Sequence, residues 1–226
     1  MNVLGLDTST AASSACVLRT DGAAFEHDPD PAALSRAPQH ARELMPAVEE
    51  VLGAAELGYS ELDAIAVGVG PGTFTGLRIG VASARALASA SGVELRPVSS
   101  LAALAEGIDS EAALPLIDAK RGELFASLYV EGERRLGPLA ATAEEVADRV
   151  REAGVTPLAA GDGSVRFRGV LEAAGILVEP EGSRAHVVRA LHICRLAADT
   201  PPVPPEAVVP EYVRLPDAKP SDGPHH

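Results

Sequence analysis

Tryptophan is absent from the sequence, and aromatic residues make up only 3% of its 226 residues. A core would therefore consist mainly of Val, Leu, Ile and Ala, and the length suits one α/β domain or two small lobes. No apolar run is long enough to cross a membrane, and the N-terminus enters a strand without a basic region, so we expect a cytoplasmic protein without membrane association. The two cysteines, Cys16 and Cys194, are expected to be reduced core residues.

Positive charge is also scarce. The sequence has 19 Lys and Arg residues against 32 Asp and Glu residues, which gives a net charge of −13. Proteins that bind nucleic acids directly carry clustered Lys and Arg against the phosphates, so this composition disfavours a large nucleic-acid site.

The histidine spacing predicts no metal site. Leu44 stands four residues after His40, and His186 and His192 are six residues apart, so neither pattern puts two ligands on one helix face. The HExxH, clustered-Cys and GxSxG patterns are absent as well. We therefore expect no bound metal, no peptidase chemistry, and solvent-facing or helix-capping roles for these histidines.

The order of elements repeats once along the chain. Each copy has a strand that ends in Asp (Asp7, then Asp118), a turn, two further strands, a helix, a strand and a helix. This order predicts an α/β fold with two lobes, residues 1–108 and a smaller 109–199. A Pro-rich tail, 200–226, would be partly packed and then disordered. The longer helices are expected at Gln39–Ala55, Thr75–Ser91, Val165–Ala174 and Ala185–Ala198. A further helix is expected from its cap at Thr142, with Glu145 completing a capping box, to about Ala153.

The segment GPGTFTGLRIG joins a strand to the second of these helices. Its glycine spacing matches neither GxGxxG nor a Walker A loop, so it predicts no phosphate site. Gly76, Gly80, Ala84 and Ala88 recur every four residues and form a stripe that lets a second helix approach closely. That helix could belong to this chain or to a partner. In the second case a Leu at position 80 or 84 would abolish pairing without unfolding the chain.

Asp7 and Asp118 are the best candidates for chemistry, and two interpretations are open. Asp at the end of a strand often accepts backbone N–H groups in its own turn, which is the favoured interpretation for Asp7. If the repeat brings the two carboxylates together across a cleft, they could instead face a Mg²⁺ held by phosphates. Thr8, Ser9 and Thr10 could then donate to a phosphate. Lys120 and Arg121, in the second turn, could contact a phosphate or balance the charge of Glu123.

Several segments together resemble the TsaB (YeaZ) family: VLGLDTST, QHARELMPAVEEVL, GPGTFTGLRIG, VSSLAALA, LIDAKRGELFASLYV, a Gly-Asp-Gly turn and PEYVR. The resemblance covers nearly the whole chain. It implies the ASKHA (actin/Hsp70/sugar-kinase) fold with two βββαβα lobes, the second reduced. TsaD-like catalytic subunits carry a His-x-x-x-His metal pair on the first long helix, and the departure here, His40 then Leu44, implies that this chain does not hold that metal.

The resemblance further implies a non-catalytic scaffold with no catalytic residues of its own. The chain would pair with a TsaD-like subunit and a TsaE-like ATPase to form N6-threonylcarbamoyladenosine beside the anticodon of ANN-decoding tRNAs. It would contact tRNA through the complex rather than directly, form a homodimer when alone, and bind ATP or ADP with Mg²⁺ weakly or not at all. The alternative is a stand-alone Mg-ATP-dependent small kinase or ATPase that uses Asp7 and Asp118.

Two sets of site residues follow from the resemblance. The partner-binding set lies on the first-lobe helices, and comprises His40, Leu44, Thr73, Phe74, Gly76, Leu77, Arg78, Gly80, Val81, Ala84, Arg85 and Ala88. The vestigial nucleotide-binding set comprises Asp7, Thr8, Ser9, Asp118, Lys120, Gly161, Asp162 and Gly163. From the residues alone, Arg78 and Arg85 are equally compatible with a solvated face and with the rim of a partner interface.

Overall fold

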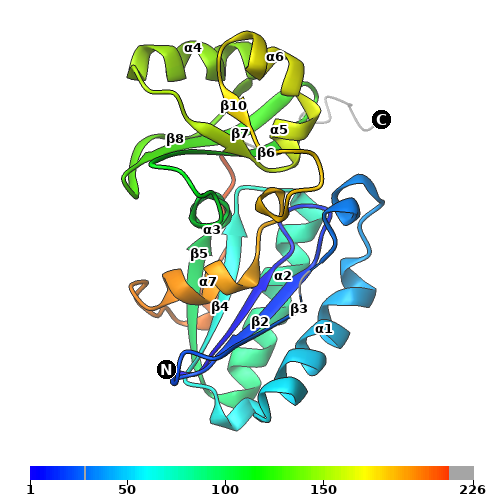
Figure 1. Cartoon of the computed structure of the whole chain (residues 1–226). Helices are drawn as coiled ribbons and strands as arrows, with labels where there is room; N and C mark the ends of the chain where they lie inside the picture. Colours follow the sequence, from blue (N-terminus) through cyan, green and yellow to red (C-terminus); the bar gives the residue numbers. More distant parts are fainter. Residues whose placement is uncertain (28, 214–226) are drawn as a thin grey trace, which may run out of the picture.

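A computed structural model describes residues 1–27 and 29–213, and its chain is organised around two five-stranded sheets (Figure 1). The first contains β1 (Val3–Asp7), β2 (Ser14–Leu18), β3 (Ala24–His27), β4 (Ala64–Gly70) and β5 (Glu94–Ser99). The second contains β6 (Ala112–Lys120), β7 (Glu123–Val130), β8 (Glu133–Thr142), β9 (Leu158–Ala160) and β10 (Leu177–Val178).

The two sheets share one topology, which confirms the predicted repeat. The first has the order β3-β2-β1-β4-β5 and the second the order β10-β9-β6-β7-β8. In both sheets, the first three strands in chain order form antiparallel pairs with one another. The fourth strand pairs in parallel with the first, and the fifth pairs in parallel with the fourth. Asp7 therefore ends β1, and Asp118 lies two residues before the end of β6, its counterpart.

Helices cover both faces of the first sheet. Alternate residues of a strand point to opposite faces. On one face, Leu4 and Leu6 pack with α1 (His40–Ala55) and α2 (Phe74–Ser91). On the other face, Val3 and Cys16 pack with α3 (Ser100–Glu106) and α7 (Ala190–Ala197). Cys194 of α7 is buried and free, as is Cys16 of β2, which confirms that both are reduced core residues.

The second lobe carries α4 (Ala143–Ala153), α5 (Asp162–Arg166) and α6 (Arg168–Ala173). The Thr142 side chain accepts from Glu145 N and the Glu145 side chain accepts from Thr142 N, so α4 begins with a complete capping box. Figure 1 shows this lobe above the first, with α3 between them. Because α3 also contacts β6 and β7, it forms much of the junction between the lobes.

The structure corrects two helices. The single helix predicted over Val165–Ala174 is two helices, α5 and α6, that meet at Phe167. The last helix begins at Ala190 rather than Ala185, because the preceding residues form a separate turn of 3₁₀ helix at Arg184–His186. The predicted boundary at residue 199 puts α7 in the second lobe, whereas α7 packs on the first sheet.

The described part of the tail, residues 200–213, packs on the first lobe, which agrees with the predicted packed part of the tail. Val203 pairs with Leu95 of β5, Val208 is buried in the first-lobe core, and Glu211 N donates to Val69 O at 2.7 Å. The part of the tail that is predicted to be disordered falls outside the described residues. Within 1–27 and 29–213, no helix is long and apolar enough to cross a membrane.

Candidate functional site

The buried carboxylate of Asp7 is hydrogen-bonded within its own turn and to Ser100. Its side chain is 1% exposed and accepts from Ser9 N at 2.8 Å, Ser9 Oγ at 2.7 Å and Ser100 Oγ at 2.8 Å. Burial raises the pKa of Asp7, against the opposing effect of these hydrogen bonds. Its carboxylate lies so close to β4 that a Cβ on Gly68 would be 1.8 Å from Oδ2. The turn interpretation of Asp7 is thus confirmed.

The carboxylate of Asp118 is also hydrogen-bonded, at the junction between the lobes. It accepts from Lys120 N at 2.8 Å, from Lys120 Nζ at 2.9 Å and from Arg166 Nη1 at 2.7 Å. Burial alone would raise the pKa of Asp118, but the bonds from Lys120 and Arg166 outweigh it, so the pKa lies below its ordinary value. The carboxylate is therefore charged and held by two cations.

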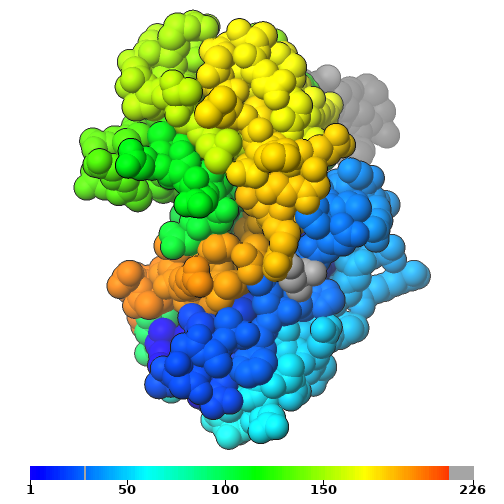
Figure 2. All heavy atoms as spheres, viewed as in Figure 1, coloured from blue at the N-terminus to red at the C-terminus, as the bar shows by residue number. Residues whose placement is uncertain are grey.

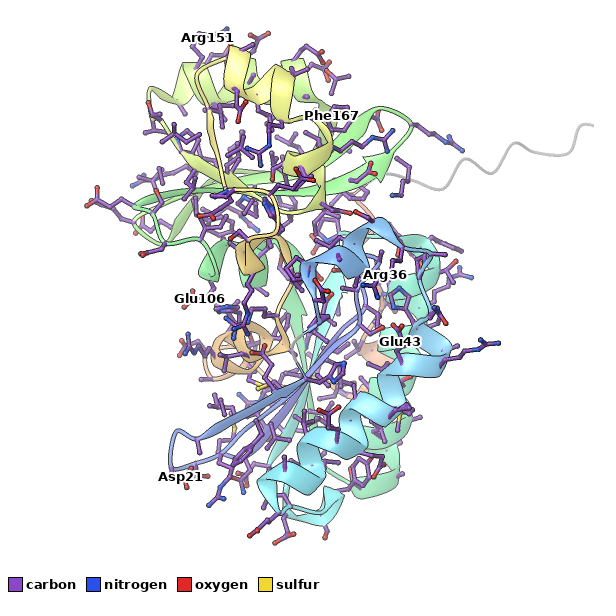
Figure 3. The ribbon with its side chains drawn as sticks, turned by 45° about the vertical axis from the view of Figure 1, so that its right-hand side comes forward. Asp21, Arg36, Glu43, Glu106, Arg151 and Phe167 are labelled. Carbon is purple, nitrogen blue, oxygen red and sulfur yellow. The ribbon has the colours of Figure 1, made fainter. Side chains whose placement is uncertain are left out.

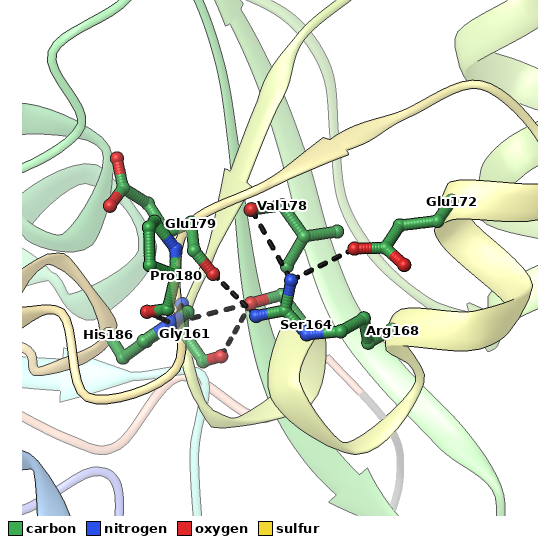
Figure 4. A network of polar contacts seen from close by, with 8 residues as sticks. All are labelled: Gly161, Ser164, Arg168, Glu172, Val178, Glu179, Pro180 and His186. Atoms are coloured by element: carbon green, nitrogen blue, oxygen red, sulfur yellow. Dashed lines mark hydrogen bonds and ion pairs between the residues drawn. The ribbon is translucent and has the colours of Figure 1, made fainter.

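The Gly161–Asp162–Gly163 turn is packed against the second sheet. Asp162 Oδ1 accepts from Asp118 N at 2.9 Å, and burial raises the pKa of Asp162. A Cβ on Gly161 would lie 2.0 Å from Leu116 O. Figure 4 shows the surrounding network, in which Gly161 N donates to His186 Nδ1 and Arg168 reaches the carbonyls of β10 and Glu179. These glycines therefore permit close packing of α5 on β6.

Two cavities lie where the lobes meet. We call the larger, of about 980 Å³, the interlobe cleft; it is bordered by the first turns of α1 and α2, the β6–β7 turn and the tail at residues 211–213. The second, of about 510 Å³, lies between the segment 30–35 and the Asp162–Arg166 helix. In Figure 2 the two lobes are separate masses joined at a narrower waist. Asp118 and Lys120 border both cavities, whereas Asp7, Thr8 and Ser9 border neither.

The predicted small-residue stripe faces the protein's own interior. A Cβ on Gly76 would lie 2.0 Å from Thr8 O, and one on Gly80 would lie 2.4 Å from Thr8 Oγ1. Ala84 and Ala88 are 0% and 1% exposed. The glycines let α2 approach the β1–β2 turn, where Thr8 Oγ1 donates to Gly76 O at 2.7 Å. The prediction that this stripe binds a partner is therefore wrong.

Four more members of the predicted partner-binding set are buried within the chain: His40, Leu44, Leu77 and Val81. Phe74 and Arg78 are exposed, and Thr73 and Arg85 are half-buried. The outer side of α2 presents a different series with the same spacing, which we call the outer ridge: Phe74, Arg78, Ala82, Ala86 and Ala90. The inward stripe and the outer ridge have the same four-residue spacing in the sequence, so the spacing alone does not show which of them faces outward.

The tail adds an aromatic side chain to the N-terminal end of the outer ridge. The rings of Phe74 and Tyr212 stack with centroids 5.6 Å apart, and Arg78 Cζ lies 3.8 Å from the Phe74 ring centroid. Arg78 Nε also donates to Tyr212 Oη at 3.4 Å. Phe74 is 46% exposed and Tyr212 39%, which is high for aromatic residues. Sequence reasoning missed Tyr212 as a site residue, although PEYVR was among the diagnostic segments.

The three candidate histidines are buried, contrary to the expectation of solvent-facing or capping roles. His40, His186 and His192 are 3%, 1% and 4% exposed. Among residues 1–27 and 29–213, no group of three His, Cys, Asp or Glu side chains is placed to hold a metal ion.

Comparisons with known proteins agree with this architecture. The family model described as TsaD, tRNA N6-adenosine threonylcarbamoyltransferase, matches residues 31–164. A solved structure of YeaZ from Pseudomonas aeruginosa superposes with a TM-score of 0.75 at 29% identity, covering 93% of this chain and 99% of that one. A second solved chain, described as similar to the peptidase YeaZ from P. aeruginosa, has the same TM-score at 30% identity and covers 94% of this chain and 99% of its own length. The chain belongs to the TsaB (YeaZ) family.

Curated relatives include named TsaB proteins and uncharacterised proteins. The TsaB protein of Escherichia coli, a tRNA threonylcarbamoyladenosine biosynthesis protein, is 32% identical over 139 residues, which are 59% of this chain and 57% of that protein. An uncharacterised Mycobacterium tuberculosis protein is 34% identical over 218 residues, 96% of this chain and 94% of its own length. The match to a 39% identical Mycobacterium leprae protein spans only 40% of that protein.

Proposed function

We propose that this TsaB-family chain is a non-catalytic subunit of the machinery that forms N6-threonylcarbamoyladenosine in ANN-decoding tRNAs. It would pair with a TsaD-like catalytic subunit and act with a TsaE-like ATPase, in the cytoplasm, contacting tRNA through the complex. The names of the TsaB relatives and the match to the TsaD family model support this assignment.

The hydrogen bonding of Asp7 and Asp118, the two acidic candidates for chemistry, supports the proposal that the chain is non-catalytic. Asp7 accepts three hydrogen bonds inside the first lobe, and Asp118 is held by Lys120 and Arg166. Neither is poised as a free general base or metal ligand. We accordingly propose weak or absent binding of ATP or ADP with Mg²⁺, which calorimetry with the isolated chain would measure.

We propose that the outer ridge is the surface that binds the partner. Its three alanines are exposed on one side of an 18-residue helix, and Met45 of the adjacent α1 is 37% exposed. The axes of two packed helices are about 8–10 Å apart, and the shorter distance requires small side chains at the contact. A TsaD-like subunit has a related fold, so an equivalent helix of the partner could pack against this ridge. In the absence of the partner, a second copy would occupy the same surface as a homodimer.

The substitution Ala82→Arg tests this surface. Because Ala82 is exposed, the variant is expected to fold normally but to lose the complex with its cognate TsaD-like subunit, since the long charged side chain would keep the helices apart. Size-exclusion chromatography with light scattering would measure the complex, and circular dichroism would measure thermal stability.

Ala153→Arg is the matched control. Ala153 is also an exposed alanine on a helix, α4, but it lies on the second lobe, so this variant should pair normally. If Ala82→Arg paired as well as Ala153→Arg, the outer ridge would not be the partner surface.

A further inference from the structure

The tail fixes an aromatic side chain beside the first turn of α2. Glu211 N donates to Val69 O near the end of β4, and Glu211 O lies 3.0 Å from the position that a Cβ would take on Gly70. On the other side of Tyr212, Val213 packs against the apolar cluster that joins α3 and α7 to the first sheet. The backbone on both sides of Tyr212 is therefore held by the first lobe, although 39% of Tyr212 is exposed.

Tyr212 completes an exposed group of three side chains, Phe74, Arg78 and Tyr212, which we call the Arg78 cluster. The two rings stack, Arg78 Cζ lies 3.8 Å from the Phe74 ring centroid, and Arg78 Nε donates to Tyr212 Oη. A guanidinium on an aromatic face gains cation–π energy. The same contacts restrict the rotamers of Arg78 before any partner binds, which lowers the entropy that binding would cost.

The cluster leaves most of the hydrogen-bonding capacity of Arg78 unused. A guanidinium has five N–H donors in a planar fork that matches the two oxygens of a carboxylate. Among residues 1–27 and 29–213, the Tyr212 hydroxyl is the acceptor that Arg78 uses, and no Asp or Glu forms an ion pair with Arg78. The Nη1 and Nη2 groups are therefore available to a carboxylate from outside the chain.

The charge of α2 favours an acidic protein group as the ligand of Arg78. The 18 residues of α2 include Arg78 and Arg85 and no Asp or Glu, whereas the whole chain has a net charge of −13. An unpaired cation at a surface favours a partner group of the opposite charge. A tRNA phosphate has that charge too, but the acidic chain repels a polyanion and lacks the clustered cations that phosphates need.

We propose that Arg78 binds a carboxylate of the TsaD-like subunit through its planar fork, and that Tyr212 of the tail positions Arg78 for this contact. Arg and aromatic residues are common among those that dominate the binding energy of interfaces. The inference rests on the proposed outer ridge, to which Phe74 and Arg78 belong, and extends that surface to the tail. Ala82, the residue that tests the ridge, lies outside the Arg78 cluster, so the two ideas can fail separately.

Calorimetry with the cognate TsaD-like subunit, without tRNA and over a range of salt concentrations, tests the carboxylate contact. Arg78→Gln should weaken binding by roughly tenfold or more, the value of a charge-assisted hydrogen bond, and should reduce the salt dependence. Arg85→Gln removes the same charge from the same helix. Arg151→Gln removes it from the far end of the second lobe (Figure 3). Each control should change the affinity by less than about threefold, as for an exposed charge.

A double-mutant cycle tests the positioning role of Tyr212. Tyr212→Leu removes the ring stacking and the hydroxyl, so it should weaken binding by the wild-type chain. It should have little further effect on Arg78→Gln, because Tyr212 acts through Arg78. Tyr212→Phe keeps the stacking and should retain most of the affinity. If Tyr212 served folding alone, Tyr212→Leu would lower thermal stability without this dependence on Arg78.

The inference is overturned if Arg78→Gln binds as tightly as the wild type, or if Arg85→Gln weakens binding as much as Arg78→Gln does. It is also overturned if Tyr212→Leu costs the same affinity in both backgrounds. If Ala82→Arg still loses the complex in any of these cases, the outer ridge remains the partner surface and only the role of the Arg78 cluster is wrong.

Discussion

Buried histidines show what single residues contribute to this fold. His186 Nδ1 accepts from Gly161 N at 3.1 Å and so ties the segment before α7 to the Gly161 turn. His192 on α7 is buried, and neither of its ring nitrogens has a hydrogen-bond partner among the residues that the structure describes. Sequence spacing could exclude a metal pair for these residues. It could not predict their burial, because burial depends on which backbone segments the fold brings to each ring.

His192 makes stability depend on pH. Burial, followed by the charges of Arg189 and Arg195 and opposed by Glu26, lowers its pKa from the ordinary 6.5 to about 4. Above pH 6.5 the ring is neutral in both the folded and the unfolded chain. As the pH falls from 6.5 toward 4, the unfolded chain takes up a proton that the folded chain does not, so the free energy of unfolding should decrease.

Urea denaturation at a series of pH values measures this effect, with His192→Leu as the comparison. The variant cannot bind that proton, so it should lose less stability than the wild type between pH 6.5 and pH 4. Equal losses in the two proteins would show that His192 does not resist protonation in the folded state.

At the scale of elements, α2 shows both the strength and the limit of sequence reasoning. Its position was predicted to within one residue at its start, and the glycine loop before it was correctly assigned as a connection between a strand and a helix. Its orientation was predicted wrongly. A four-residue spacing defines a stripe but not its direction. Here the inward stripe is fixed by Thr8, which lies far from α2 in sequence.

Paired glycine substitutions test the inward orientation. Gly80→Ala should destabilise the chain by about 1–3 kcal/mol through overpacking against Thr8, partly offset by roughly 1 kcal/mol of helix propensity. Gly53→Ala on α1 is the matched control. A Cβ there meets nothing within 4 Å, so it should stabilise the chain by up to about 1 kcal/mol. Urea denaturation measures both, and a stabilising Gly80→Ala would argue against this packing.

For the whole molecule, the repeat was the most informative feature of the sequence. The order of elements and the two strand-end aspartates predicted two lobes of one topology, and both sheets have it. The assignment of α7 was less successful. Helix periodicity shows an apolar face but not which sheet covers it, and the cluster of Cys16, Ala190 and Cys194 joins α7 to the first lobe. The interlobe cleft also depends on contacts between distant segments.

Reconstitution of the tRNA modification tests the central claim, that this chain supports a catalytic partner without performing the chemistry. The measured quantity would be N6-threonylcarbamoyladenosine in an ANN-decoding tRNA, incubated with the cognate TsaD-like and TsaE-like proteins and the threonylcarbamoyl adenylate. Addition of the wild-type chain or Ala153→Arg should produce the modified nucleoside, whereas Ala82→Arg, or the chain without its TsaD-like partner, should not. Full modification without this chain, or modification by this chain alone, would contradict the account.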